Sequence, residues 1–159
     1  MESIFKMTEG TLNRYKLDIP SCPYPLDVER FDGLEQMSAL YHYTIRFTSS
    51  HPDLTAEMML SKTATLSMGV GKLLDSVVGK IVHGVVTNFR RLAGSRDQVT
   101  YEIILEPFIS LLDKQFRTHR FFVNKSVPEV VEQILGEHGL KGWEYEFKLK
   151  QTYPKREQI

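Results

Sequence analysis

The sequence predicts a mainly β protein (α+β overall), in which an antiparallel β-barrel domain precedes an incomplete α/β domain with one clear amphipathic helix. Apolar and polar residues alternate with a period of two through the first two-thirds of the 159 residues. The turns between these stretches are short and contain Gly, Ser or Asp, and the clearest helical signals come near the end. Strands with one polar face, joined by short turns, are typical of an antiparallel barrel or sandwich.

Length and composition describe a globular chain and exclude several classes of protein. A domain of this size buries about 70% of its unfolded surface, so its core needs no metal or disulfide. The 20 Lys+Arg residues balance the 20 Asp+Glu residues, which argues against binding to nucleic acids or anionic membranes. The single cysteine, Cys22, excludes an intramolecular disulfide framework. No apolar run reaches the ~20 residues of a membrane span. The opening MESIFKMTEG lacks the apolar stretch of a signal peptide, so we expect any export to avoid the general route.

The alternation defines six expected strands and a core. The strands are expected over residues 14–19, 25–31, 40–49, 63–70, 77–92 and 99–106. Gly84, in the middle of the long fifth strand, suggests a bend or bulge. Because successive side chains point to opposite faces of a strand, the apolar ones are expected to face inward together. The predicted core contains Tyr43, Ile45, Phe47, Leu66, Met68, Val85, Tyr101 and Ile103.

The clearest helix is expected after Ser126. Ser126 and Glu129 have the spacing of a capping box, and Gly139 supplies a stop signal. Two shorter helices are expected over 54–60, beginning at Asp53, and over 107–114. The apolar stripe of the capped helix consists of Val127, Val130, Val131, Ile134, Leu135 and His138.

A domain boundary is expected near Gln115, because the alternation changes beyond it. Residues 1–115 would form the barrel domain, and residues 116–159 the truncated start of an α/β domain. Some forty residues are too few to close a core alone. The elements expected in this second domain are a strand over 120–123, the capped helix, and the alternating apolar residues Trp143, Tyr145, Phe147 and Leu149.

No catalytic, cofactor-binding or metal-binding residue is predicted. Cys22 has no neighbouring histidine or cation in the sequence that would activate it, so we expect it to be inert. The histidines show no spacing that would gather a metal site. They are His42, His51, His83, His119 and His138.

Two small sets of residues leave other functions open. Tyr41 and Tyr43, flanked by Arg46, could stack on bases in a small barrel that binds single-stranded nucleic acid or sugar. A core face is the favoured interpretation, given the neutral charge balance. Asp27 and Glu29 could form the carboxylate pair of a hydrolase, although like charges on an exposed strand are typical of edge protection.

Seven short motifs follow one another along most of the chain. The most specific block is FFVNKSVPEVV at 121–131, followed by EHGL at 137–140. The others are LDVERFDGLE at 26–35, LYHYTI at 40–45, LSKTATL at 60–66, HGVVT at 83–87, LEPF at 105–108 and YPKRE at 153–157. In this order they resemble the motifs of VgrG proteins, the spike proteins of bacterial type VI secretion. Ser61 and Thr63 depart from the family pattern.

The resemblance implies a structural protein and not an enzyme, with no cofactor. It implies the fold of the baseplate hub of contractile phage tails, where barrels from three chains form a pseudo-sixfold ring beneath a trimeric spike. The implied partners are further copies of the chain in a homotrimer, the Hcp tube, and baseplate and effector proteins, with no nucleic acid. The implied route is assembly in the bacterial cytoplasm and secretion through the type VI apparatus without a signal peptide.

VgrG proteins continue beyond the region matched by this chain. The resemblance therefore implies an N-terminal fragment, or the product of a shortened gene, that keeps the collar and lacks the needle. With one barrel, the remaining contact between copies should be small, below roughly 1,200 Å² in total. We expect the isolated chain to be monomeric or weakly associated.

Overall fold

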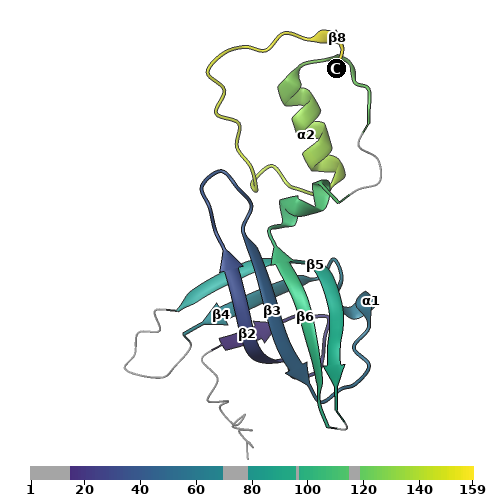
Figure 1. Cartoon of the computed structure of the whole chain (residues 1–159). Coiled ribbons are helices and arrows are strands. Elements are labelled where there is room, and N and C mark those ends of the chain that lie inside the picture. The colour runs from purple at the N-terminus through teal and green to yellow at the C-terminus, as the bar shows by residue number, and fades with distance from the viewer. Residues whose placement is uncertain (1–14, 70–78, 96, 115–118) are drawn as a thin grey trace, which may run out of the picture. The chain divides into compact units, whose positions relative to one another are not determined.

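A computed structural model describes residues 15–69, 79–95, 97–114 and 119–159 (Figure 1). Contacts divide the chain into two compact units, Met1–Ser110 and Leu111–Ile159. The boundary expected near Gln115 and the first residues of the strand expected over 77–92 lie outside the described residues.

The first unit is a six-stranded antiparallel sheet that curls into a nearly closed barrel (Figure 1). Its order is β1-β4-β5-β6-β3-β2, so β1 and β2 are the edge strands. These edges approach each other, and the rings of Tyr15 and Phe31 meet edge to face with centroids 5.1 Å apart. The predicted fold class is therefore confirmed. The strands are β1 (Tyr15–Asp18), β2 (Asp27–Leu34), β3 (His42–Ser49), β4 (Thr63–Met68), β5 (Lys80–Gly94) and β6 (Val99–Glu106).

The barrel core follows the predicted alternation. Tyr43, Ile45 and Phe47 on β3 are buried, as are their neighbours on the other strands. Leu66, Tyr101 and Ile103 also belong to this core, and Met68 is half-buried against it. Val85 is buried but lies outside the core cluster; its neighbour Val86 takes the inward position that was predicted for it. Inward-facing residues of adjacent strands thus form one continuous apolar interior.

Gly84 lies where the long strand β5 changes partner. β5 pairs with β4 as far as Val85 and with β6 from Val85 onward. A Cβ atom at position 84 would overlap the backbone carbonyl oxygen of Glu106, so the close approach of β6 requires glycine here. The register shifts of β5 lie further along, between Val86 and Asn88 and between Arg91 and Ala93.

Two of the predicted helices are shorter than expected. Helix α1 (Ala56–Met59) has Thr55 as its N-cap, whereas the sequence predicted a start at Asp53. The reason is Tyr101, whose hydroxyl donates to the Pro52 carbonyl at 2.6 Å and accepts from the Leu54 amide at 3.3 Å. These bonds hold the preceding residues in a loop. The helix predicted over 107–114 is a 3-10 helix, η1 (Phe108–Leu112).

The second unit consists of β7 (Val123–Lys125), α2 (Val127–Glu137) and β8 (Arg156–Gln158), with β7 and β8 paired antiparallel. The strand predicted over 120–123 was placed too early. The alternating residues from 143 to 149 form no strand, and the segment that pairs with β7 is β8. Trp143 accordingly remains 83% exposed.

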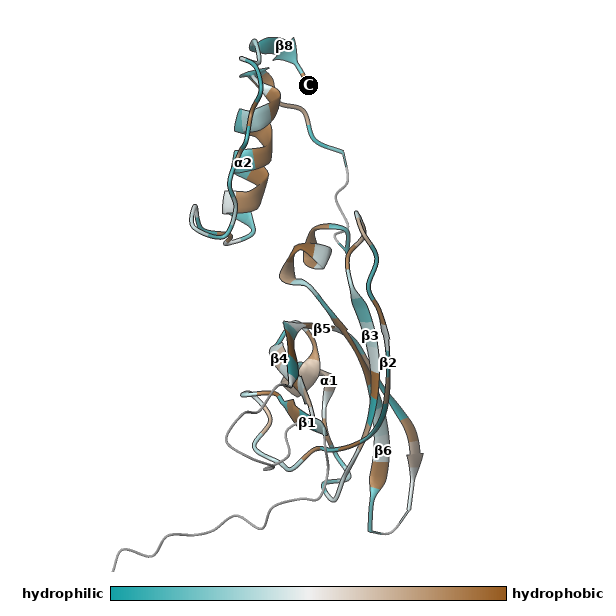
Figure 2. Cartoon of the chain, turned by 90° about the vertical axis from the view of Figure 1, so that its left-hand side faces the viewer, coloured by the Kyte–Doolittle hydropathy of each residue, from teal (hydrophilic) through white to brown (hydrophobic). Residues whose placement is uncertain are grey.

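The ends of α2 are set by the residues that the sequence indicated. Ser126 and Glu129 form the capping box: the Ser126 side chain lies at the Glu129 backbone amide, and the Ser126 amide donates to Glu129 Oε2 at 2.7 Å. The Ser126 hydroxyl also donates to Glu129 Oε2 at 2.9 Å. Gly139, with a φ of +80°, ends the helix in the left-handed region. Figure 2 shows the apolar stripe along α2, from which Val130 and Leu135 are buried. In the described part of the chain, no helix is long and apolar enough to span a bilayer.

Candidate interaction surfaces

The outer face of the barrel carries a buried carboxylate. Glu102 on β6 lies directly opposite Arg46 on β3 and Arg90 on β5, and it is only 3% exposed. Arg46 Nε donates to Glu102 Oε2 at 2.7 Å, and Arg90 Nε to Glu102 Oε1 at 2.7 Å. The bond from Arg46, reinforced by Arg90, holds the pKa of Glu102 below its usual range. Glu102 lies on the polar face of β6, between the inward-facing Tyr101 and Ile103, and the two arginine side chains cover it.

Tyr41, Tyr43 and Arg46 do not form a platform for stacking bases or sugars. The Tyr43 ring is buried in the barrel, while the Arg46 guanidinium lies on the outer face with Glu102. Tyr41 is occupied as well, because its hydroxyl donates to the backbone carbonyl of His83. The nucleic-acid or sugar interpretation therefore loses the exposed aromatic surface on which it depended.

Asp27 and Glu29 lie exposed on the edge strand β2. The β2–β3 register shifts between Val28 and Arg30, so Glu29 is the extra residue of a bulge. This bulge lets Val28 and Phe31 both face inward and breaks the regular alternation that was expected to align the two carboxylates. A general acid–base pair needs one carboxyl in a poorly solvated site, and both of these side chains are exposed.

The histidines are distributed over both units. His51 stacks on Tyr24 with ring centroids 3.7 Å apart, His83 Nδ1 lies 3.0 Å from Thr65 Oγ1, and His138 Nδ1 lies 2.7 Å from the Ile134 carbonyl. His119 is exposed. Within the described ranges, no group of three or more His, Cys, Asp or Glu side chains could hold a metal ion.

His42 is placed between a hydroxyl and a carboxylate. Its Nε2 lies 3.4 Å from Thr44 Oγ1, and its Nδ1 lies 3.3 Å from Glu106 Oε1. This order of hydroxyl, imidazole and carboxylate resembles the nucleophile, base and acid of hydrolase triads. Both distances are long for hydrogen bonds, however, and β3 is paired with a strand on each side, so its backbone amides are engaged in ladders and do not form an oxyanion site. This arrangement gives no support to an acyl-transfer reaction.

Glu35, Tyr43 and Lys80 form a second polar cluster, at the hairpin between β2 and β3. The Tyr43 hydroxyl and the Lys80 ammonium each donate to Glu35 Oε1 at 2.6 Å. The bond from Lys80, and then that from Tyr43, lowers the pKa of Glu35. Burial, followed by the bond to Glu35, raises the pKa of the Tyr43 hydroxyl.

One end of the barrel exposes apolar side chains. β3 begins opposite the end of β6, because Tyr43 pairs with Leu105, so the β2–β3 hairpin and η1 lie at the same end of the sheet. Met37 at the hairpin tip is 97% exposed. We call this surface the apolar end; it consists of Leu34, Met37, Leu40, Phe108 and Ile109. Exposed apolar side chains gathered at one end of a sheet suit a protein contact site.

The sequence reasoning missed both features of this hairpin. The available signal for the apolar end was Leu34 and Met37 within the predicted connection, together with Leu40 at the start of the next predicted strand. The Glu35–Lys80 contact had no local signal, because the two residues are 45 positions apart in the sequence.

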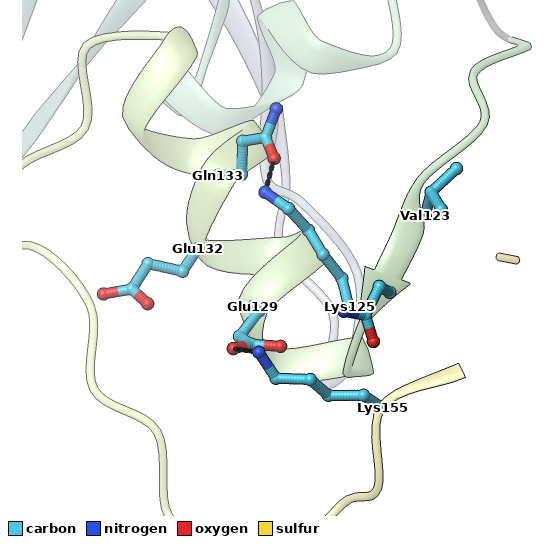
Figure 3. Close-up of a pocket in the computed structure, with 7 residues that line it drawn as sticks. Val123, Lys125, Glu129, Glu132, Gln133 and Lys155 are labelled. Carbon is cyan, nitrogen blue, oxygen red and sulfur yellow. Dashed lines mark hydrogen bonds and ion pairs between the residues drawn. The ribbon is translucent and has the colours of Figure 1, made fainter. Parts of the chain in front are cut away.

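The second unit contains an open pocket of about 430 Å³ between β7, α2 and the segment before β8 (Figure 3). Lys155 Nζ lies 3.3 Å from Glu129 Oε1, and the Lys125 ammonium donates to the Gln133 side chain. One ion pair and one hydrogen bond to an amide thus join side chains that line the pocket. The lining residues are Val123, Asn124, Lys125, Glu129, Glu132, Gln133 and Lys155.

Comparison with known families decides what this barrel is. Residues 34–159 match the sequence model of the phage tail baseplate hub (GPD) family, which is most of the chain. The chain belongs to the phage tail baseplate hub family. Among hub-like structures, it superposes with a TM-score of 0.72 and 37% identity on the E. coli c3393 protein, covering 91% of this chain and 38% of that one. That protein is described as a type VI secretion component with structural similarity to the T4 tail proteins gp27 and gp5.

Other relatives of this hub-family chain are spike proteins. It is 30% identical over 129 residues to the type VI secretion system spike protein VgrG1a of Pseudomonas aeruginosa, covering 81% of this chain and 19% of the relative. It is 28% identical over 143 residues to VgrG4b of the same species, covering 90% and 17%. The resemblance to VgrG proteins is confirmed, and the chain spans about a fifth of their length.

The hub fold extends to a more distant protein. The 43 kDa tail protein of prophage MuSo2 from Shewanella oneidensis superposes with a TM-score of 0.51 at 12% identity, covering 94% of this chain and 45% of that one. At this identity the likeness concerns the fold alone.

Proposed function

We propose that the chain forms part of the base of a type VI secretion spike, acts as a structural component and not as an enzyme, and helps deliver effectors to target cells. The observation that carries the proposal is the 0.72 TM-score at 37% identity to a type VI secretion component. In this role residues 1–115 supply a hub-like barrel, and residues 116–159 begin a second α/β domain.

The proposed partners are two further copies of the chain in a trimer, the Hcp tube, and baseplate and effector proteins. The apolar end supports such contacts, because a broad apolar surface suits protein docking better than catalysis. The proposed location is the bacterial cytoplasm during assembly, followed by secretion through the type VI apparatus.

A chimera tests this function in a complete spike. The corresponding N-terminal segment of VgrG1a is replaced by this chain in Pseudomonas aeruginosa with an active apparatus, and the chimera is measured in the culture medium. We expect export of the chimera at a level comparable to that of the parent. The Gly84→Val chimera is the control, because its added side chain would overlap the Glu106 backbone. A chimera that folds and trimerises but stays inside the cell would contradict the proposal.

A further inference from the structure

The β2–β3 hairpin is tied to β5, although the two are not neighbours in the sheet. Going around the barrel in one direction, β3 and β6 lie between β2 and β5. In the other direction, β1 and β4 lie between them. Nevertheless, Lys80 at the start of β5 donates to Glu35 in the hairpin at 2.6 Å. The Tyr41 hydroxyl donates to the backbone carbonyl of His83, again on β5. The hairpin is therefore held across the barrel by side chains.

Tyr43 organises this contact. Gly33 is its direct cross-strand partner, and a Cβ atom at Gly33 would overlap the Tyr43 ring. The ring therefore lies over the glycine, an arrangement that fixes aromatic side chains on sheets. Its hydroxyl reaches Glu35 Oε1 at 2.6 Å, and Lys80 Nζ lies 5.8 Å from the ring centroid. Glu35 Oε1 thus accepts hydrogen bonds from both the Lys80 ammonium and the Tyr43 hydroxyl.

Backbone hydrogen bonds do not close the barrel between its edge strands β1 and β2 in the described part of the chain. No ladder joins β1 to β2 among the described residues, so the two sides of the barrel are linked there by side chains such as Tyr15 and Phe31. Hydrogen bonds with an ionised donor and acceptor are stronger than neutral ones. Lys80 and Glu35 remain half exposed, which weakens their contribution relative to that of a buried pair.

We propose that Glu35, Tyr43 and Lys80 form a latch that fastens the β2–β3 hairpin to β5 and so sets the position of the apolar end. With the latch closed, Leu34, Met37 and Leu40 are presented on an ordered tip. With the latch broken, the hairpin opens locally while the sheet remains paired. The latch is thus a conformational device beyond the proposed function, and it can be tested without any partner.

Amide hydrogen exchange of the intact chain tests the latch. Tyr43→Phe keeps the ring and removes the hydroxyl, and Lys80→Met keeps the length and removes the charge. We expect each to speed exchange over residues 33–42 by about 5- to 30-fold, the factor that one or two kcal/mol produces, with β6 unchanged. In the double variant, the change in the free energy of hairpin opening should be smaller than the sum of the changes in the two single variants. The reason is that both substitutions act on the same contact with Glu35.

Arg30→Met is the matched control. Arg30 pairs with Asp32 on β2, the strand that leads into the hairpin, and both side chains are 64% exposed. Amide exchange over residues 33–42 should therefore stay within about twofold of the parent. Hairpin exchange unchanged by Tyr43→Phe and Lys80→Met would overturn the latch. A rise spread equally over β3, β4 and β6 would also overturn it, because it would mean a global loss of stability.

Discussion

At the scale of single residues, Glu102 shows how the outer face of the barrel contributes to stability. Its carboxylate joins three strands, because Arg46 and Arg90 approach it from β3 and β5. Glu102→Gln keeps the shape and removes the charge. We expect a loss of about 1.5–3 kcal/mol in the free energy of unfolding, the range for hydrogen bonds to charged groups. Urea denaturation measures it.

Glu29→Gln is the control for this change, because Glu29 is also a glutamate but is exposed on an edge strand. Its effect should stay within about 0.5 kcal/mol. An equal effect of the two substitutions would show that Glu102 has no special role.

A second residue-scale prediction concerns acid. The bonds from Arg120 and then Gln133 lower the pKa of Glu137 from 4.5 to about 2. A carboxyl whose folded-state pKa is lowered stabilises the fold above its unfolded pKa, and that contribution is lost as pH falls through the folded value. The helicity of α2 should therefore fall between about pH 4.5 and pH 2. Circular dichroism of the parent and Glu137→Gln measures this, and identical acid profiles would contradict it.

At the scale of elements, the capped helix offers a direct test. Ser126→Ala removes the hydroxyl that lies at the Glu129 backbone amide in the capping box and that donates to Glu129 Oε2 at 2.9 Å. It leaves the Ser126 amide bond to the same carboxylate oxygen at 2.7 Å. We expect the second unit to lose about 0.5–2 kcal/mol, the usual cost of losing such a cap. Exchange at the first amides of α2 measures it. Ser126→Thr, which keeps a hydroxyl, should behave like the parent.

Elements differ in how far the sequence could predict them. Strand faces and the ends of α2 were predictable, because alternation and the Ser126–Gly139 cap signals are local. The start of α1 was not, because Tyr101, about 50 positions away, holds the preceding loop. The alternation of residues 143–149 was uninformative for a related reason, since periodicity does not say which segment will pair with β7.

The interaction surfaces follow the same division. The aromatic face of β3 was correctly predicted as core by its alternation. The cluster of Glu35, Tyr43 and Lys80 depends on tertiary contacts, which single-sequence reasoning does not reach. The bulge at Glu29 likewise depends on pairing with β3, so the expected alignment of the two carboxylates could not be judged from the sequence.

At the scale of the whole molecule, we expect weak self-association. The chain spans about a fifth of the length of its VgrG relatives, so we expect an interface made by these residues alone to be small. A small interface must overcome the entropy lost on association, which consumes much of the gain from burial. Sedimentation at micromolar concentration should show monomers or weak, variable association. A tight, salt-insensitive trimer would show that this barrel alone carries the threefold contact.

Association with Hcp tests the central claim most directly. The tagged chain is purified from a bacterium with an active type VI apparatus, and the bound Hcp is quantified. The same measurement is made for Met37→Asp, at the apolar end, and for the control Leu92→Asp, an exposed apolar position on β5. We predict that Hcp co-purifies with the parent and with Leu92→Asp, and that Met37→Asp recovers several-fold less. A folded parent chain that recovers no more Hcp than an unrelated tagged protein would contradict a role at the base of the spike.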